Sequence, residues 1–211
     1  YTNTLPNIWY LGPKYKRPIN PDEFLLSEML KENNYKTRNF GKWHLGDAEK
    51  FLPTNHGFDE FYGILFSNDM WKFHPERPEG YPDDLMLYRN ETPIQSIIDQ
   101  SDLTKDITDE SIRFIEKNKD NQFFLYIAHP QPHVPLFASK DFNGSTGNGL
   151  FADVISEIDF SVGRVIEALE KNNLTEKVED SFKEVNFKQE ECNHKLSDID
   201  VNNKKIIDIN Q

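Results

Sequence analysis

Two short segments of the chain hold side chains that suit an anionic ligand. The first carries Lys42 and His44, two residues apart, directly after a predicted strand. In an extended segment such residues point the same way, so we expect both cationic groups to face one ligand. The second carries His129 and His133, after an apolar run over residues 123–128. The prolines between these histidines exclude a helix, so they are not the helical two-histidine motif of zinc proteases.

The same residues also have interpretations without function. A Lys-x-His pair is common on protein surfaces, and a histidine after a buried strand is often a helix cap or a hydrogen-bonded core group. The sequence has no Ser-His-Asp order, no glycine-rich phosphate loop and no Cys/His spacing for zinc. From the residues alone we therefore predict an anion-binding α/β hydrolase and go no further.

The elements that must position these side chains alternate between helix and strand. The hydrophobic pattern predicts helices over residues 21–33, 103–115 and 154–169, and strands over 35–40 and 123–128. Asn20 is the candidate N-cap of the first helix, and the uninterrupted apolar run over 123–128 is typical of a strand buried on both faces. Residues 47–100 are expected to be irregular and to wrap a site. In such folds ligands collect at the carboxyl ends of the strands.

Composition limits the class of protein. The 211 residues carry 24 Lys+Arg against 36 Asp+Glu, a formal net charge of -12, and 13% of them are aromatic. This composition predicts a folded domain with a real core and excludes a nucleic-acid-binding surface. No stretch approaches the roughly 20 apolar residues of a membrane span. A single cysteine, Cys192, excludes an internal disulfide, and three N-glycosylation acceptor triplets begin at Asn90, Asn143 and Asn173.

Three segments together resemble the sulfatase family, closest to its arylsulfatase and N-acetylgalactosamine-6-sulfatase branch. They are the hexapeptide Gly-Lys-Trp-His-Leu-Gly of residues 41–46 with residues 51–63, the segment 123–135, and the segment 153–169. They occur in the family's own order, and the likeness covers roughly residues 11–178. It implies an incomplete alkaline-phosphatase-like α/β sandwich, in which helices flank a mostly parallel central sheet. It also implies a sulfuric ester hydrolase as the parent activity.

The resemblance also implies roles for individual residues. Lys42 and His44 would contact the sulfate group, and His133 would reach the sulfate ester and assist the leaving group. Substrate binding would fall to Ser67, Asn68, Asp69 and His129. Fixed cations suit this chemistry because negative charge gathers on the bridging oxygen as the S–O bond breaks.

Two parts of the family pattern have no counterpart in the sequence. Family members make their nucleophile, formylglycine, from the cysteine of a Cys-x-Pro-Ser-Arg segment, whereas Cys192 stands in Glu-Cys-Asn-His. The Asp pair and the Asp-Asn pair that bind calcium are also absent, so no metal ligand is assigned here. We therefore expect a partial catalytic domain over residues 1–178, a divergent and poorly ordered tail over 179–211, and an inactive fragment of an enzyme that uses formylglycine and calcium.

Two alternatives stay open: a non-catalytic sulfatase-like protein that binds anions or partners, and a phosphodiesterase or phosphonate hydrolase of the same superfamily. The expected ligand is a sulfated small molecule or a sulfated glycan. The expected location is the secretory pathway, lysosomal or extracellular, or the periplasm of a bacterium. The sequence leaves open which sulfate ester is bound, what the oligomeric state is and whether the chain folds alone.

Overall fold

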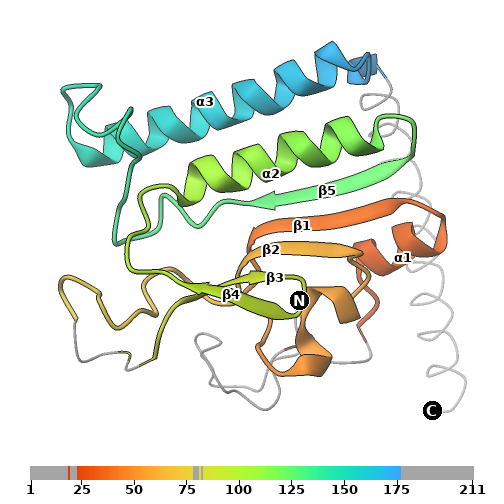
Figure 1. The fold of residues 1–211 in the computed structure, drawn as a ribbon, viewed down its shortest axis with the longest axis horizontal. Coiled ribbons are helices and arrows are strands. Elements are labelled where there is room, and N and C mark those ends of the chain that lie inside the picture. The colour runs from red at the N-terminus through yellow and green to blue at the C-terminus, as the bar shows by residue number, and fades with distance from the viewer. Residues whose placement is uncertain (1–18, 20–22, 78–80, 82, 177–211) are drawn as a thin grey trace, which may run out of the picture. The chain divides into compact units, whose positions relative to one another are not determined.

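A computed structural model describes residues 19, 23–77, 81 and 83–176 of the chain. Its elements are, in chain order, α1 (Leu26–Glu32), β1 (Lys36–Lys42), the short 3-10 turns η1 (Glu49–Phe51) and η2 (Pro53–Asn55), β2 (Glu60–Ile64), β3 (Met86–Arg89), β4 (Thr92–Ser96), α2 (Leu103–Asn118), β5 (Phe123–Ala128) and α3 (Leu150–Lys171) (Figure 1). Two compact units, Tyr1–Ala168 and Leu169–Gln211, divide the chain, so the last residues of α3 belong to the second. The predicted tail over 179–211, Asn20 and Cys192 lie outside the described residues.

One mixed sheet of five strands organises the first unit, in the order β4-β3-β2-β1-β5. The central strand β1 pairs in parallel with β2 and with β5, and β3 and β4 add an antiparallel hairpin at the β2 side. The predicted α/β class is confirmed, and the parallel part of the sheet is the three strands β2, β1 and β5. Because parallel strands end at the same edge, Gly41 lies opposite both Gly63 and Ala128.

Two glycines let these three strands approach at that edge. A side chain at Gly41 would overlap the carbonyl of Ala128, and one at Gly63 would overlap the carbonyl of Gly41. Both glycines also have positive φ angles, 108° and 156°, which residues with a Cβ rarely adopt. The sheet edge that carries the candidate residues therefore depends on glycine at both positions.

Apolar cores cover both faces of the sheet. On one face α2 packs Ile107 and Phe114 against Phe40 and Tyr62, and α3 lies beside α2 (Figure 1). On the other face Trp43 and its neighbours in the loop after β1 pack against side chains from and after β2. The loop with Lys42 and His44 is thus attached to the core through the residue between them.

Several predictions about the elements were wrong in part. Residues 47–100 are not irregular throughout, because they contain the short strands β2, β3 and β4. The turn at Asn90 interrupts the alternation of apolar and polar side chains between β3 and β4, so the hydrophobic pattern does not reveal these strands. The strand over 123–128 is not buried on both faces: β5 is the outermost strand of the described sheet, and Tyr126 is 49% exposed. The first helix begins at Leu26 rather than near residue 21. Its start is capped by Glu28, whose Oε2 accepts the backbone N–H of Leu25 at 2.7 Å.

The predicted apolar face of α3 is only partly buried, with Val154 at 1% exposed. Ile155, Val162 and Ile166 are exposed, whereas Asp153 and Glu157 are buried. The carboxylates face inward because they accept backbone N–H groups of the preceding loop: Glu157 binds the amide of residue 139 at 2.9 Å, and Asp153 binds those of residues 144 and 146 at 2.8 and 3.0 Å.

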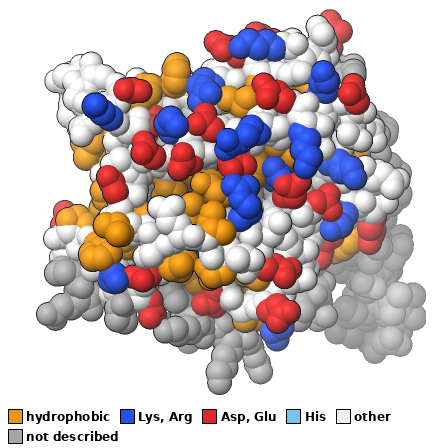
Figure 2. Space-filling model, in the orientation of Figure 1, with side chains coloured by type: hydrophobic (Ala, Val, Ile, Leu, Met, Phe, Trp, Pro, Cys, Tyr) orange, Lys and Arg blue, Asp and Glu red, His pale blue; other side chains and the backbone are white. Residues whose placement is uncertain are grey.

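Charges of both signs are mixed over the surface. On the face drawn in Figure 2, Lys and Arg side chains stand beside Asp and Glu side chains, and hydrophobic side chains are exposed between them. No helix among the described residues is long and apolar enough to cross a bilayer.

Candidate anion-binding site

The loop after β1 continues alongside the loop after β2. Lys42 is the last residue of β1 and lies opposite Ile64, and the backbone N–H of His44 donates to the carbonyl of Leu65 at 2.9 Å. Between them Trp43 is buried and donates its indole N–H to the carbonyl of Phe51 at 2.8 Å. This buried indole fixes the loop while Lys42 and His44 stay partly exposed.

The extended geometry assumed for Lys42 and His44 is wrong at the second residue. His44 has a left-handed φ of 59°, so the two side chains are not related by strand alternation. Instead the His44 ring packs edge-on against Phe66, with the ring centroids 6.1 Å apart. The next residue, Ser67, opens the Ser-Asn-Asp segment, which places His44 directly beside that segment.

Asn68 joins the loop after β2 to the loop after β5. Its side chain is fully buried, and its amide nitrogen donates to the carbonyl of His133 at 3.2 Å and to that of Pro135 at 3.1 Å. Gln100 in turn donates its amide to the carbonyl of Asn68 at 2.9 Å. These bonds hold the His133 loop against the end of β2 and give Asn68 a structural role.

His133 is exposed, and its Nδ1 bonds the carbonyl of Val134 at 2.6 Å. A carbonyl only accepts, so Nδ1 carries a proton and Nε2 is the ring nitrogen left for a ligand. The same Nδ1 lies 3.9 Å from Oδ1 of Asp69, which is 8% exposed. The structure thus brings Asp69 to His133.

His129, at the end of β5, is part of a buried chain of hydrogen bonds. Thr108 Oγ1 lies 2.6 Å from the carbonyl of Thr104 and 2.6 Å from Oγ of Ser161, which lies 3.2 Å from Nε2 of His129. Because Thr108 donates to the carbonyl, Ser161 must donate to Thr108, and His129 must donate from Nε2. Burial lowers the pKa of His129, which keeps this histidine neutral, with a buried Nδ1 that has no hydrogen-bond partner among the described residues.

The Ser-Asn-Asp segment carries three buried polar atoms without a hydrogen-bond partner among the described residues. Ser67 Oγ, Asn68 Oδ1 and Asp69 Oδ1 are buried and make no hydrogen bond within the described part of the chain. Buried polar groups are normally paired, so an unpaired cluster at a strand end is typical of a site that binds water or ligand. These are the three consecutive residues that the sequence assigned to substrate binding.

Sequence analysis missed two neighbours of this segment, His74 and Arg77. Arg77 Nη2 donates to Asp69 Oδ2 at 3.2 Å and lies 3.3 Å from Nε2 of His74. Both residues stand in a stretch rich in proline that was assigned to irregular structure, and neither has a spacing that marks it. Only the fold of the loop after β2 brings them to Asp69.

A hollow of about 150 Å³ is lined by Phe66, Met70 and Tyr88. Its lining includes three carboxylates: Asp47, Asp83 and Asp84. Their negative charge makes this hollow unsuited to an anion. The anion-binding candidates therefore lie at the sheet edge and not in this hollow.

The described residues contain no group of three or more His, Cys, Asp or Glu side chains that could hold a metal ion. The candidate groups at the sheet edge are instead one lysine, two partly exposed histidines and a set of hydrogen-bonding side chains. The chemistry of such a set is suited to binding an oxyanion and transferring a proton. That Lys42, His44 and His133 share one pocket stays a prediction.

Comparison with known proteins shows which family the chain belongs to. A family model described as Sulfatase matches residues 2–178. The chain is 35% identical over 176 residues to an arylsulfatase of Hemicentrotus pulcherrimus, covering 78% of this chain and 31% of that protein. It is 38% identical over 158 residues to human N-acetylgalactosamine-6-sulfatase, covering 72% of this chain and 30% of that protein. The chain thus spans about a third of the length of these curated relatives.

Solved structures give the same match. The chain aligns with the PsFucS1 sulfatase from Pseudoalteromonas sp. with a TM-score of 0.61 at 26% identity, covering 70% of this chain and 34% of that one. It aligns with Ps i-CgsB in complex with k-i-k-neocarrahexaose with a TM-score of 0.63 at 30% identity, covering 78% of this chain and 40% of that one.

Proposed function

The chain belongs to the sulfatase family, and from this premise we propose that it carries part of the active site of a sulfuric ester hydrolase. In this proposal Lys42, His44 and His133 surround the sulfate group. One observation carries the proposal: Lys42 ends β1 and His133 follows β5, and these parallel strands end at the same sheet edge, where Gly41 lies opposite Ala128. The hydrogen bonds from Asn68 to the His133 loop support it, since they hold that loop at the same edge.

Each cation has a part that its chemistry supports. Lys42 supplies a compact positive charge for the sulfuryl oxygens, and His44 adds a second donor beside it. His133 protonates the departing bridging oxygen from Nε2, while the Val134 carbonyl orients the ring through Nδ1 at 2.6 Å. The unpaired hydroxyl of Ser67 donates to a sulfuryl oxygen.

The family also implies a formylglycine nucleophile and a calcium ion, and the residues present do not fit either group. The only cysteine, Cys192, lacks the Pro-Ser-Arg that follows it in the family's motif. The described residues hold no cluster of metal ligands. Accordingly, no step is assigned here to either group, and the hydrolysis of a sulfate ester is proposed for a protein that contains both.

We further propose a sulfated saccharide as the ligand and the secretory pathway as the location. The saccharide is supported by the relatives, one of which is named N-acetylgalactosamine-6-sulfatase, and by the structural neighbour in complex with k-i-k-neocarrahexaose. The location is supported by the glycosylation acceptors Asn90 and Asn143, which are both exposed.

A second candidate function is non-catalytic binding of sulfated ligands. The unpaired hydroxyl of Ser67 beside the candidate cations supports it, because binding needs hydrogen-bond donors and positive charge and no nucleophile. Both functions require the same pocket, so a binding experiment tests their common part first.

The test titrates the purified chain with 4-nitrophenyl sulfate and follows backbone amide shifts by NMR. We expect saturable shifts around Lys42, His44 and His133, and loss of binding in Lys42→Ala and His133→Ala. Lys105→Ala is the matched control, because Lys105 is a surface residue paired with Asp109 on α2. Tighter binding of a phosphate diester than of the sulfate ester would favour the phosphodiesterase alternative, and unchanged binding in His133→Ala would contradict the proposed site.

A further inference from the structure

The loop after β2 places another cation, Arg77, next to His133 of the proposed sulfate site. Arg77 Nη2 donates to Oδ2 of Asp69 at 3.2 Å, while Nδ1 of His133 lies 3.9 Å from Oδ1 of the same carboxylate. Arg77 and His133 therefore flank one carboxylate. The Arg77 side chain is 52% exposed, so a ligand reaches it from solvent.

The protonation of His74 follows from its two contacts. The backbone N–H of Glu76 donates to Nδ1 of His74 at 3.1 Å, so Nδ1 has no proton and the proton of the neutral ring is on Nε2. Nε2 lies 3.3 Å from Nη2 of Arg77. A guanidinium nitrogen only donates, so this contact joins two donors and is not a hydrogen bond.

The result is a surplus of donors in one place. The His74 ring is buried, at 2% exposed, and its Nε2–H has no acceptor among the described residues. Arg77 has Asp69 as its only acceptor in the described part of the chain, although a guanidinium offers five N–H groups. A buried donor without an acceptor costs free energy, and an oxyanion placed between the two residues would satisfy both.

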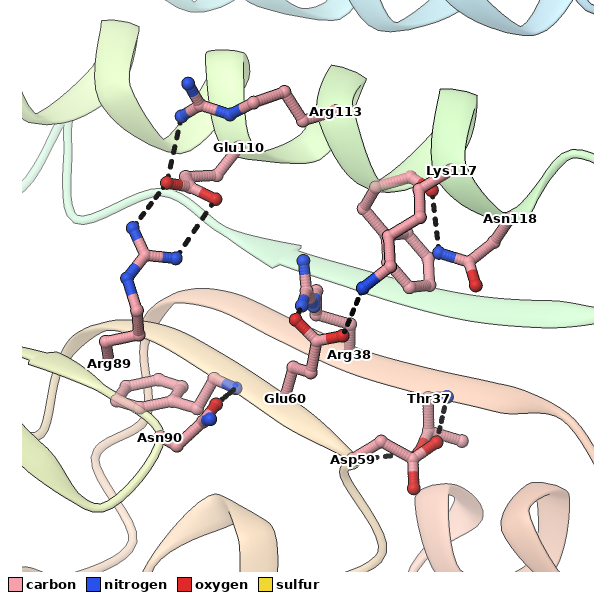
Figure 3. Close-up of polar contacts among 12 residues, drawn as sticks. Thr37, Arg38, Asp59, Glu60, Arg89, Asn90, Glu110, Arg113, Lys117 and Asn118 are labelled. Carbon is pink, nitrogen blue, oxygen red and sulfur yellow. Dashed lines mark hydrogen bonds and ion pairs between the residues drawn. The ribbon is translucent and has the colours of Figure 1, made fainter.

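Two arginine clusters elsewhere in the described residues have a different set of partners around each cation. Arg89 donates through both Nη nitrogens to the carboxylate of Glu110, at 3.3 and 2.6 Å, and Arg113 completes the cluster at 2.9 Å (Figure 3). Arg38 and Lys117 likewise share Glu60. In both clusters the cations gather around a carboxylate, whereas Arg77 contacts the carboxylate of Asp69 on one side and the Nε2–H donor of His74 on the other.

We propose that His74 and Arg77 form a second anion subsite beside His133, which binds a carboxylate or a second sulfate of the same sulfated saccharide. The proposal rests on the proposed function, because it places the hydrolysed sulfate at Lys42, His44 and His133. Arg77 then selects among sulfated saccharides for those with a second acidic group. A carboxylate and a sulfate share the oxyanion chemistry that both donors recognise.

The test compares three ligands of one sugar: a monosulfated monosaccharide, its disulfated form, and a monosulfated uronic acid. Dissociation constants are measured by NMR titration or calorimetry on the full chain. We expect the wild type to bind one or both ligands with a second acidic group about tenfold more tightly than the monosulfated sugar, as one added charge-assisted hydrogen bond gives. In Arg77→Gln this preference should fall below about twofold, and in Arg77→Lys it should be retained in part.

Arg113→Gln is the matched control, because it removes one exposed arginine of the same charge from α2, where Arg113 pairs with Glu110, and it should keep the full preference. Thermal melting of each variant shows that it is folded, and Arg77→Lys answers the question if Arg77→Gln unfolds. The preferred ligand identifies the second group as a carboxylate or a sulfate. Binding of the monosulfated sugar without any preference would overturn the subsite and leave the proposed function standing. A preference that survives in Arg77→Gln would also overturn it, and binding of none of the three ligands would overturn both proposals.

Discussion

The side-chain amide of Asn68 bonds the carbonyl of His133 across 65 positions of sequence, at 3.2 Å. This bond, with its companion to Pro135 at 3.1 Å, joins the loops that follow β2 and β5. The catalytic histidine of the proposed site therefore depends on a buried amide that itself contacts no solvent.

Replacing Asn68 should lower the free energy of unfolding more than replacing an exposed asparagine does. Asn68→Ala removes two hydrogen bonds and leaves the carbonyl of His133 without its donor, while the carbonyl of Pro135 keeps the amide of Gln131 at 3.3 Å, so the free energy of unfolding should fall by about 2–4 kcal/mol. Urea unfolding measures the change. Asn33→Ala is the control, since Asn33 is exposed and makes one side-chain bond to a carbonyl, at 2.8 Å, so it should lose less than about 1 kcal/mol. Equal losses in the two variants would contradict the structural role of Asn68.

Gly41 should tolerate no side chain. Gly41→Ala places a Cβ on the carbonyl of Ala128 at a φ of 108°, so we expect a loss of at least about 3 kcal/mol or failure to fold. Gly163→Ala is the matched control, because Gly163 is a helical residue of α3 with open space around it. Alanine there should stabilise the chain by roughly 0.5–1 kcal/mol. Circular dichroism melts compare the two, and a Gly41→Ala chain as stable as the wild type would show that β1 and β5 are not in close contact.

Protonation of His129 should couple stability to pH. Burial lowers the pKa of His129 below the value of 6.5 that it has in the unfolded chain, so the unfolded state binds the proton more readily. The stability that neutral His129 contributes to the folded state is therefore fully present above about pH 6.5. It is lost as the pH falls from there through the lower pKa of the folded state. Unfolding free energies measured between pH 8 and pH 5 should fall less steeply in His129→Gln than in the wild type. Parallel curves for the two proteins would mean that another group carries the pH dependence.

The 211-residue chain should show no sulfatase turnover. Lys42, His44 and His133 stabilise charge, but none of them replaces a nucleophile that adds to sulfur, and loss of a nucleophile costs many orders of magnitude in rate. The assay uses purified chain, added calcium and an activated aryl sulfate. Saturable turnover that disappears in His133→Ala would prove the expectation wrong.

Much of the local structure followed from the sequence. Helical periodicity located α2 and α3, the apolar run located β5, and the prolines around His133 kept that loop out of a helix. The motif over residues 41–46 indicates the family, and the family carries the α/β class with it. These features are readable because the residues that determine them are neighbours in the chain.

Other features of the site were decided by tertiary contacts. The left-handed turn at His44, the link from Asn68 to His133 and the proton position on His129 all depend on partners in other elements. The inward carboxylates of α3 could not be predicted from its apolar residues, because they accept backbone N–H groups of the loop that precedes the helix. Hydrogen bonds between distant segments have no period and no fixed spacing, so the sequence determined which residues the site contains, and only the folded chain determined which of them contact each other.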